Sequence, residues 1–258
     1  MKIGVIGKGF VGTAIQKGFE SQGHYVISHD VRLETSIRDV ISAPIVYICV
    51  PTPSKDTGEC NTDIVESVIR ELYALGYKGK VCVKSTVKPG SIDKWISEYT
   101  SLFTISYVPE FLRERCSIED FLYNQNVLVI GTNDSQAEEL IKECHGTLPT
   151  HTVTMKPIEA ELMKYFSNSY KAMRVTFANS FYKLCEELNA NYDVIRNGFL
   201  FHGIGEGDYL KVNDKYRGFG GSCLPKDTKG LAKLVEELNL DINIFKTIIE
   251  ENEKFKDG

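Results

Sequence analysis

The stretch that decides the fold is KIGVIGKGFVG, residues 2–12. It begins as an apolar run typical of a buried strand, and its last six residues fit the pattern GxGxxG. Gly7 permits a tight turn, Gly9 lets the backbone approach a phosphate group, and Gly12 permits close packing of a helix on the strand. The pattern therefore predicts a strand, a glycine turn and a helix N-terminus whose amide groups can bind a pyrophosphate.

An acidic residue after the next apolar run completes this nucleotide-binding pattern. Asp30 ends the run YVISHD (25–30), 18 residues after Gly12. A carboxylate there accepts hydrogen bonds from a ribose diol and repels a 2′-phosphate, so the sequence favours NAD over NADP, although Arg32 weakens that preference. The alternative is a glycine turn with only a packing role, which the surrounding strand and helix pattern disfavours.

Apolar runs alternate with amphipathic stretches through the first half of the chain, which predicts an α/β fold. Several runs are apolar throughout, as in a parallel sheet covered on both faces, so we expect an N-terminal Rossmann-type doubly wound parallel sheet. The predicted strands are 2–7, 25–30, 45–50, 80–86, 103–109 and 126–131, and the predicted intervening helices include 10–21, 62–75 and 91–100.

The pattern becomes helical after about residue 150. From Ile158 to Leu188 apolar residues recur at helical spacing over roughly eight turns. Further helices are predicted within 189–198, 227–240 and 241–256, and loops in the glycine-rich stretch 203–222. The sequence thus predicts two domains, an NAD-binding Rossmann-like domain over 1–150 and a helical central domain with a catalytic cysteine loop over 151–258.

Composition excludes several classes of protein. The chain is 42% hydrophobic with a formal net charge of −5, which argues against a nucleic-acid surface. It has no membrane-length apolar run and no signal-like N-terminus, so we expect neither a membrane partner nor secretion. Seven scattered cysteines without a CxxC pair favour a reduced, cytoplasmic protein, and the five histidines lack metal-ligand spacing, so we expect no metal.

A cysteine in an unusual setting is the main candidate for chemistry. Cys223 lies in RGFGGSCLPKD (217–227), after a glycine-rich run and three residues before Lys226. An accessible thiolate can add to an aldehyde, and hydride loss from the thiohemiacetal gives a thioester that water hydrolyses. The glycines provide access and Lys226 favours the thiolate. The alternatives are an inert core cysteine and a metal ligand.

Three polar residues elsewhere are weaker candidates. Lys164 and Asn168 are four residues apart on the long predicted helix, so they share a face. A lysine there can stabilise an oxyanion, and an asparagine can orient substrate or water. Glu110 follows a predicted strand and can act as a general base. A solvated helix face and an ordinary surface carboxylate are equally compatible with these patterns.

Five motifs, in order along nearly the whole chain, resemble the UDP-glucose/GDP-mannose dehydrogenase family. The resemblance implies an NAD-dependent, four-electron oxidation of a sugar-nucleotide primary alcohol to a carboxylate, with UDP-glucose as the best guess for the substrate. The motifs are CVPTP (49–53), STVKPGS (85–91), PEFLRE (109–114), EAELMKYFSNSYKA (159–172) and, as the most specific, GFGGSCLPKD (218–227).

The resemblance also implies roles for individual residues. Cys223 is the nucleophile, Lys164 and Asp227 support oxyanion stabilisation and water activation, and Thr86, Glu110 and Asn168 serve the water and proton chemistry. The implied cofactor-binding residues are Gly7, Gly9, Phe10, Val11, Gly12, Asp30, Pro51, Thr52, Ser85, Thr86, Glu110 and Lys226. The implied substrate-binding residues are Phe111, Leu112, Arg113, Glu114, Lys164, Asn168, Gly220 and Cys223, the first four through their backbone.

The sequence departs from the family pattern at three places. The third domain of family members, which closes over the nucleotide, is expected to be absent, so a separate chain is a candidate partner and weak sugar-nucleotide binding is expected. The family's substrate-contacting arginine has no clear counterpart among Lys211, Lys215 and Arg217, and Arg115 replaces a glycine usual after FLRE. A homodimer through the helix 158–188 is expected from its apolar surface and from the resemblance.

Two other functions remain open at this point. The two-electron β-hydroxyacid dehydrogenases share a Rossmann domain, a helical domain and a Lys-x3-Asn pair, but they lack the cysteine signature. Cys223 therefore distinguishes the two classes. The other possibility is a non-catalytic NAD-binding or assembly module, left by loss of the third domain.

Overall fold

The computed structural model describes residues 1–99, 101–202, 208–212, 217–221 and 223–255. The chain forms two compact units, one of residues 1–53 and 60–164, the other of residues 54–59 and 165–258. The division falls within the long helix α7 and not at residue 150. The reason is that a seventh strand, His151–Met155, pairs with the sheet and carries these residues into the first unit.

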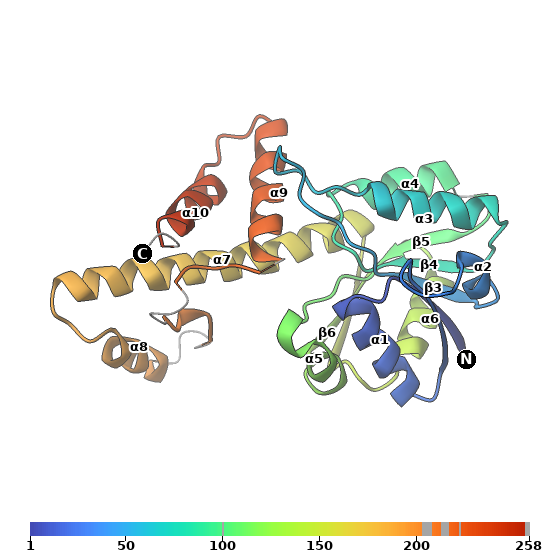
Figure 1. Ribbon diagram of the computed structural model, residues 1–258, viewed down its shortest axis with the longest axis horizontal. Helices are drawn as coiled ribbons and strands as arrows, with labels where there is room; N and C mark the ends of the chain where they lie inside the picture. The colour runs from blue at the N-terminus through green and yellow to red at the C-terminus, as the bar shows by residue number, and fades with distance from the viewer. Residues whose placement is uncertain (100, 203–207, 213–216, 222, 256–258) are drawn as a thin grey trace. The chain divides into compact units, whose positions relative to one another are not determined.

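The first unit is built on a seven-stranded sheet in the order β2-β1-β3-β4-β5-β6-β7 (Figure 1). All neighbouring strands are parallel except β5 and β6, so the predicted α/β fold with a Rossmann-type sheet is confirmed. Strand β7 is not among the predicted strands, because this edge strand is mostly exposed and carries no apolar run. The strands are β1 Lys2–Ile6, β2 Tyr25–His29, β3 Ile45–Ile48, β4 Lys80–Val83, β5 Thr104–Tyr107, β6 Val127–Gly131 and β7 His151–Met155.

Helices cover both faces of this sheet, and each face has its own apolar core. Strand β3 shows the division, because Val46 and Ile48 belong to one core cluster while Ile45 and Tyr47 belong to the other. Burial on both faces explains why the central strands are apolar throughout. The helices of this unit are α1 Phe10–Ser21, α2 Ile37–Val40, α3 Asp63–Ala74, α4 Ser91–Tyr99, α5 Ser117–Tyr123 and α6 Ser135–His145, with a short 3₁₀ turn, η1 Glu114–Cys116.

The order of the strands determines where a ligand can bind. Strand β1 lies between β2 and β3, so the chain passes to opposite sides of β1 in two successive crossovers. In open α/β sheets the crevice outside the carboxyl ends of strands at such a reversal is the usual ligand site. The glycine turn of residues 7–12 follows β1 at this point, so the fold places the predicted nucleotide-binding residues at the favoured position.

The second unit is helical, as predicted. Its helices are α7 Pro157–Glu187, which begins in the first unit, α8 Tyr192–Phe201, α9 Leu224–Glu237 and α10 Ile244–Glu253, with a 3₁₀ turn, η2 Asp208–Leu210. Helix α9 begins three residues before the predicted helix, because Pro225 is favoured in the first turn of a helix and so marks its start. Within the described part of the chain, no helix is both long and apolar enough to cross a membrane.

A buried carboxylate joins α7 to the N-terminus of α4. Glu161 is fully buried and accepts hydrogen bonds from the amides of Gly90 (2.7 Å) and Ile92 (2.9 Å). Burial raises the pKa of Glu161 to about 7, although the two amide donors oppose that shift. The Glu161 carboxyl therefore binds a proton more tightly in the folded protein than in the unfolded chain. Because of this difference, the contribution of Glu161 to the free energy of unfolding falls as pH rises from about 4.5 to about 7.

We expect Glu161→Gln to remove this contribution. Between pH 5 and pH 8 the free energy of unfolding of the variant, relative to wild type, should rise by on the order of 3 kcal/mol. Urea unfolding across this range measures the difference directly. The comparison with wild type is needed because burial lowers the pKa of His145, which makes the free energy of unfolding rise with pH. In wild type this rise partly masks the opposite effect of Glu161. Glu139→Gln, on exposed α6 surface, is the control, and a pH-independent difference for Glu161→Gln would contradict the assignment.

Candidate active site

The three glycines of the 7–12 turn have different structural roles. Gly7 has φ +95°, and a Cβ there would lie 2.6 Å from the Cys49 carbonyl oxygen. A Cβ at Gly12 would lie 1.8 Å from the Gly7 carbonyl oxygen, so the α1 helix can pack on the turn only with glycine. Gly9 precedes the first residue of α1 and has open space where its Cβ would be. This is the approach that a pyrophosphate at the helix N-terminus requires.

Asp30 lies beside this turn, at the end of β2. Its carboxylate is mostly buried and accepts hydrogen bonds from the Lys8 amide (2.6 Å) and from the Arg32 amide and side chain (2.8 to 3.0 Å). The Arg32 hydrogen bonds and the Lys8 amide hold the pKa of Asp30 well below its usual range. The carboxylate is therefore ionised, as ribose recognition needs. The exposed Arg32 guanidinium occupies part of the acceptor capacity of this carboxylate, which a ribose diol would also use.

We expect Asp30→Ala to weaken NAD binding by about 1–3 kcal/mol, the scale of lost charge-assisted hydrogen bonds. Discrimination against NADP should fall as well, because the carboxylate no longer repels a 2′-phosphate. Calorimetric titration with both nucleotides gives the two affinities. Arg32→Ala is the matched control, since it frees the carboxylate and should preserve the preference for NAD. Wild-type affinity for NADP equal to that for NAD would contradict the role of Asp30.

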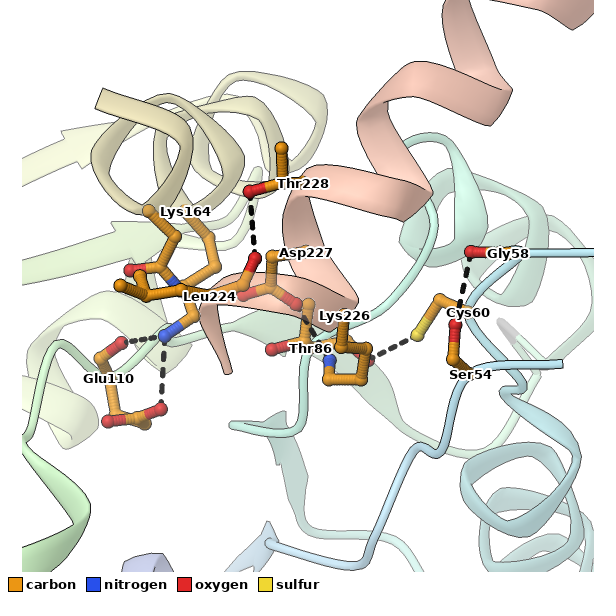
Figure 2. Close-up of polar contacts among 11 residues, drawn as sticks. Ser54, Gly58, Cys60, Thr86, Glu110, Lys164, Leu224, Lys226, Asp227 and Thr228 are labelled. Carbon is orange, nitrogen blue, oxygen red and sulfur yellow. Dashed lines mark hydrogen bonds and ion pairs between the residues drawn. The ribbon is translucent and has the colours of Figure 1, made fainter. Parts of the chain in front are cut away.

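The carboxyl ends of β3 and β4 supply a second group of predicted cofactor residues. Thr52, Ser85 and Thr86 are buried, and the Ser85 hydroxyl donates to the Val50 carbonyl (2.7 Å). The thiol of Cys60 donates to the Thr86 carbonyl at 3.3 Å (Figure 2). Because parallel strands end at one edge of a sheet, these residues follow the same edge as the glycine turn, together with the exposed Pro51.

Lys84, which lies between strand β4 and Ser85, is not among the predicted site residues. It is buried, and burial lowers the pKa of its ammonium group. A lysine between an apolar strand and a Ser-Thr pair is the only signal that the sequence offers, and that signal does not distinguish a buried lysine from an exposed one.

Glu110 and Lys164 form a buried ion pair in the first unit. The Lys164 ammonium group donates to Glu110 Oε1 (3.0 Å) and to the Glu110 carbonyl (2.6 Å) (Figure 2). It also lies 5.6 Å from the centre of the Phe111 ring. Glu110 Oε2 accepts from the Leu112 amide (2.7 Å). Both side chains are almost fully buried, so the structure excludes the solvated alternatives for these two residues.

The predicted substrate segment 111–114 is partly engaged within the protein. The Leu112 amide bonds to Glu110, and the Arg113 amide donates to Asp120 at 2.9 Å. The Arg113 guanidinium also pairs with Asp120 (2.6 Å) and holds the pKa of that carboxyl at about 2. The Leu112 and Arg113 amides are therefore already bonded within the protein.

The second unit holds the candidate nucleophile and its neighbours. Cys223 directly precedes α9 and is half-buried, and the helix N-terminus stabilises negative charge at that position. Asp227, in the first turns of α9, is buried and accepts from Asn168 Nδ2 (2.6 Å) and from Lys226 Nζ (2.7 Å). Figure 2 shows the Lys226–Asp227 contact. No group of three metal-ligating side chains occurs among the residues that the structure describes.

Other predicted residues of this unit are less informative. Lys226, predicted at the cofactor, pairs with Asp227, and Gly220 and Lys211 are exposed. Arg217 bonds to Glu186 (3.2 Å) and lies 4.1 Å from the centre of the Tyr182 ring, and Lys215 lies outside the described residues.

The structure therefore brings the predicted catalytic residues together in two pairs. Glu110 contacts Lys164 in the first unit, and Asn168 contacts Asp227 in the second. Lys164 and Asn168 are four residues apart in the continuous helix α7, so they project from the same helix face. The sheet and its glycine turn together define a Rossmann-type, dinucleotide-binding class of protein.

Comparison with known proteins gives the particular family. Residues 27–148 match the NAD binding domain of the UDP-glucose/GDP-mannose dehydrogenase family, and residues 158–254 match its central domain. The chain belongs to this family, and it carries the family's NAD-binding domain. The predictions of the family and of NAD as the cofactor are confirmed.

Individual relatives agree with this assignment. UDP-glucose 6-dehydrogenase of Rickettsia conorii is 35% identical over 83% of this chain and 50% of its own length. A UDP-glucose dehydrogenase structure from Pyrobaculum islandicum has a TM-score of 0.89 and 28% identity, covering 98% of this chain and 68% of that one. The structure of a Mycobacterium tuberculosis 3-hydroxyisobutyrate dehydrogenase is 14% identical and has a TM-score of 0.77. The match covers 98% of this chain and 93% of that one, and it shows a shared fold. The chain spans about half the length of the first curated relative.

Proposed function

We propose that this protein oxidises the primary alcohol of a nucleotide sugar to a carboxylate, with UDP-glucose as the favoured substrate and UDP-glucuronate as the product. The observation that carries the proposal is Cys223, a half-buried cysteine at a helix N-terminus within the family's central domain. Bound NAD supplies the oxidising power, so that one alcohol, two NAD⁺ and one water give one carboxylate, two NADH and three protons.

Cys223 carries the covalent part of the proposed mechanism. Its thiolate adds to the aldehyde carbon that the first oxidation leaves, and a bond forms between sulfur and carbon while the carbonyl oxygen takes the electron pair. Loss of hydride from this thiohemiacetal gives a thioester. Water then adds to the thioester carbon, the carbon–sulfur bond breaks, and the carboxylate leaves as the thiolate is restored.

Lys164 and Glu110 supply charge and proton transfer in this proposal. The Lys164 ammonium group is buried, where a positive charge stabilises a developing oxyanion more strongly than it does in water. Glu110 keeps that ammonium group in position and accepts protons from the alcohol or from water. The Leu112 amide fixes the other carboxylate oxygen, so the pair is preorganised.

Asn168 and Asp227 position substrate and water. Because the Asn168 amide nitrogen donates to Asp227, its carbonyl oxygen is left as an acceptor for a hydroxyl group or water. Asp227 thus fixes the orientation of Asn168, and the Lys226 ammonium group balances its buried charge. The proposed role of Asp227 in water activation is therefore exerted partly through Asn168.

The proposal is tested by screening NADH release across UDP- and GDP-sugars and measuring the mass of each product. We expect UDP-glucose to release two NADH per molecule and to yield a product of uronate mass. An aldehyde product with one NADH would instead favour a two-electron dehydrogenase of the β-hydroxyacid type. The fold shared with the 3-hydroxyisobutyrate dehydrogenase does not by itself support that function. NAD binding without turnover of any sugar would favour the non-catalytic module.

We also propose a homodimer through α7. Large apolar side chains along this helix are 37–74% exposed and spaced by three, four or seven residues, which places them on a single helix face; they are Leu162, Phe166, Tyr170, Phe177, Phe181 and Leu184. A second copy of the same face is the partner that covers it symmetrically.

Light scattering at micromolar concentration should therefore give twice the chain mass for wild type. Phe177→Glu should lower this mass toward that of one chain, because it places a charge within the exposed apolar face of α7. Phe201→Glu is the matched control, since Phe201 is an exposed phenylalanine on α8 and not on the apolar face of α7. A wild-type mass of one chain would refute the dimer.

A further inference from the structure

A buried asparagine from the C-terminal helix binds the backbone of the glycine run before Cys223. Asn252 of α10 is only 1% exposed. Its Oδ1 accepts from the Phe219 amide at 2.6 Å, and its Nδ2 donates to the Phe219 carbonyl at 3.0 Å. One side chain thus satisfies both backbone groups of Phe219, which are otherwise costly to bury.

The neighbouring residue is held in the same way from α7. The Gly218 amide donates to Asn179 Oδ1 (3.2 Å), and Asn179, which is also buried, donates to the Val175 carbonyl (2.9 Å). Gly218 has φ +71°, and a Cβ there would lie 2.5 Å from Asn252 Oδ1. Glycine at 218 is therefore required both by the backbone conformation and by the close approach of Asn252.

The same contacts bear on the position of Cys223. The Phe219 side chain packs with Ala172 of α7 and Ile248 of α10, and Leu224, the residue after Cys223, packs against this cluster. On the other side, the Asp227 amide donates to the Cys223 carbonyl (2.9 Å) at the start of α9. The cysteine is therefore bracketed by anchored residues, four positions before it and one after it.

We infer that Asn252 is a positioning residue for Cys223. It acts through the backbone of Gly218 and Phe219 and not by contact with substrate or cofactor. Asn252 does no chemistry, but removing it leaves the buried Phe219 amide and carbonyl without their partner, so the glycine run shifts and Cys223 shifts with it. The inference rests on the proposed function, in which Cys223 is the nucleophile.

The test compares Asn252→Ala with wild type by two readouts. We expect kcat/KM with the sugar nucleotide to fall by about 100-fold, the scale of a displacement of about 1 Å at a reacting group. Independently of activity, the rate at which iodoacetamide alkylates Cys223, followed by peptide mass, should change several-fold. Tyr192→Phe is the matched control, because it removes one buried hydrogen bond of the same unit, to the Leu210 carbonyl (2.7 Å), and should change neither readout.

Two further variants keep the test decisive. Asn252→Asp retains the acceptor for the Phe219 amide but places a second oxygen against the Phe219 carbonyl, so it should lower kcat/KM in a folded protein. Asn179→Ala, which removes the Gly218 contact but leaves Phe219 bonded to Asn252, should have a smaller effect in the same direction. Wild-type kcat/KM and alkylation rate in the folded Asn252 variants would overturn the inference. A separate measurement tests the proposed function on which this inference rests. If a Cys223→Ser variant forms carboxylate at the wild-type rate, the proposed function of Cys223 is wrong, whatever the Asn252 variants show.

Discussion

Cys223→Ser is expected to form no carboxylate from a nucleotide sugar, while it still binds NAD with wild-type affinity. Serine is a far weaker nucleophile at neutral pH than a thiolate, and no thioester can form for water to hydrolyse. The side chain is half-buried and directly precedes α9, so the smaller oxygen should cost little stability. Product mass and the number of NADH released per sugar measure the effect.

The control for this experiment is Cys116→Ser. Cys116 is the other half-buried cysteine among the described residues, whereas the remaining five are buried. We expect this variant to retain acid formation, which excludes a general effect of removing a partly accessible thiol. Carboxylate formation by Cys223→Ser at the wild-type rate would exclude the covalent mechanism and leave the family fold without an assigned nucleophile.

Lys164→Met is expected to lose both activity and stability. The substitution leaves the Glu110 carboxylate buried without its cationic partner, and breaking a buried ion pair in this way typically costs about 3–5 kcal/mol. It also removes the charge proposed to stabilise the oxyanion, so kcat should fall with it. Urea unfolding at pH 7 and the rate of NADH release give the two quantities.

The double variant Lys164→Met/Glu110→Gln separates these two losses. Replacing the unpaired carboxylate by a neutral amide should restore much of the stability, because no buried charge remains, while activity stays low. Lys246→Met is the control for removing a lysine from an ion pair, since the Lys246–Glu250 pair is exposed and should contribute little. Equal stability of the single and double variants would show that Glu110 is not held as a charge by Lys164.

Much of the first unit can be predicted from local sequence. The turn of residues 7–12 is recognisable because each of its glycines meets a separate backbone requirement, and the strand–helix alternation follows from burial on both sheet faces. Strand β7 could not be predicted in this way, because an exposed edge strand needs no apolar run. Cys223 stands out in the sequence by its glycine-rich setting, the resemblance to the family supplies the role of nucleophile, and that role stays a prediction.

The sequence by itself determined the fold class, the nucleotide turn and the family, because these depend on periodicity and on short motifs. Only the tertiary structure decided the surroundings of the polar residues. Lys164 reads equally well as a surface lysine until the fold buries it against Glu110, and nothing local marks Asn252 as a partner of Phe219, 33 residues earlier. The physical reason is that a buried polar group is defined by its partner, and the partner is brought close by packing between elements distant in the chain.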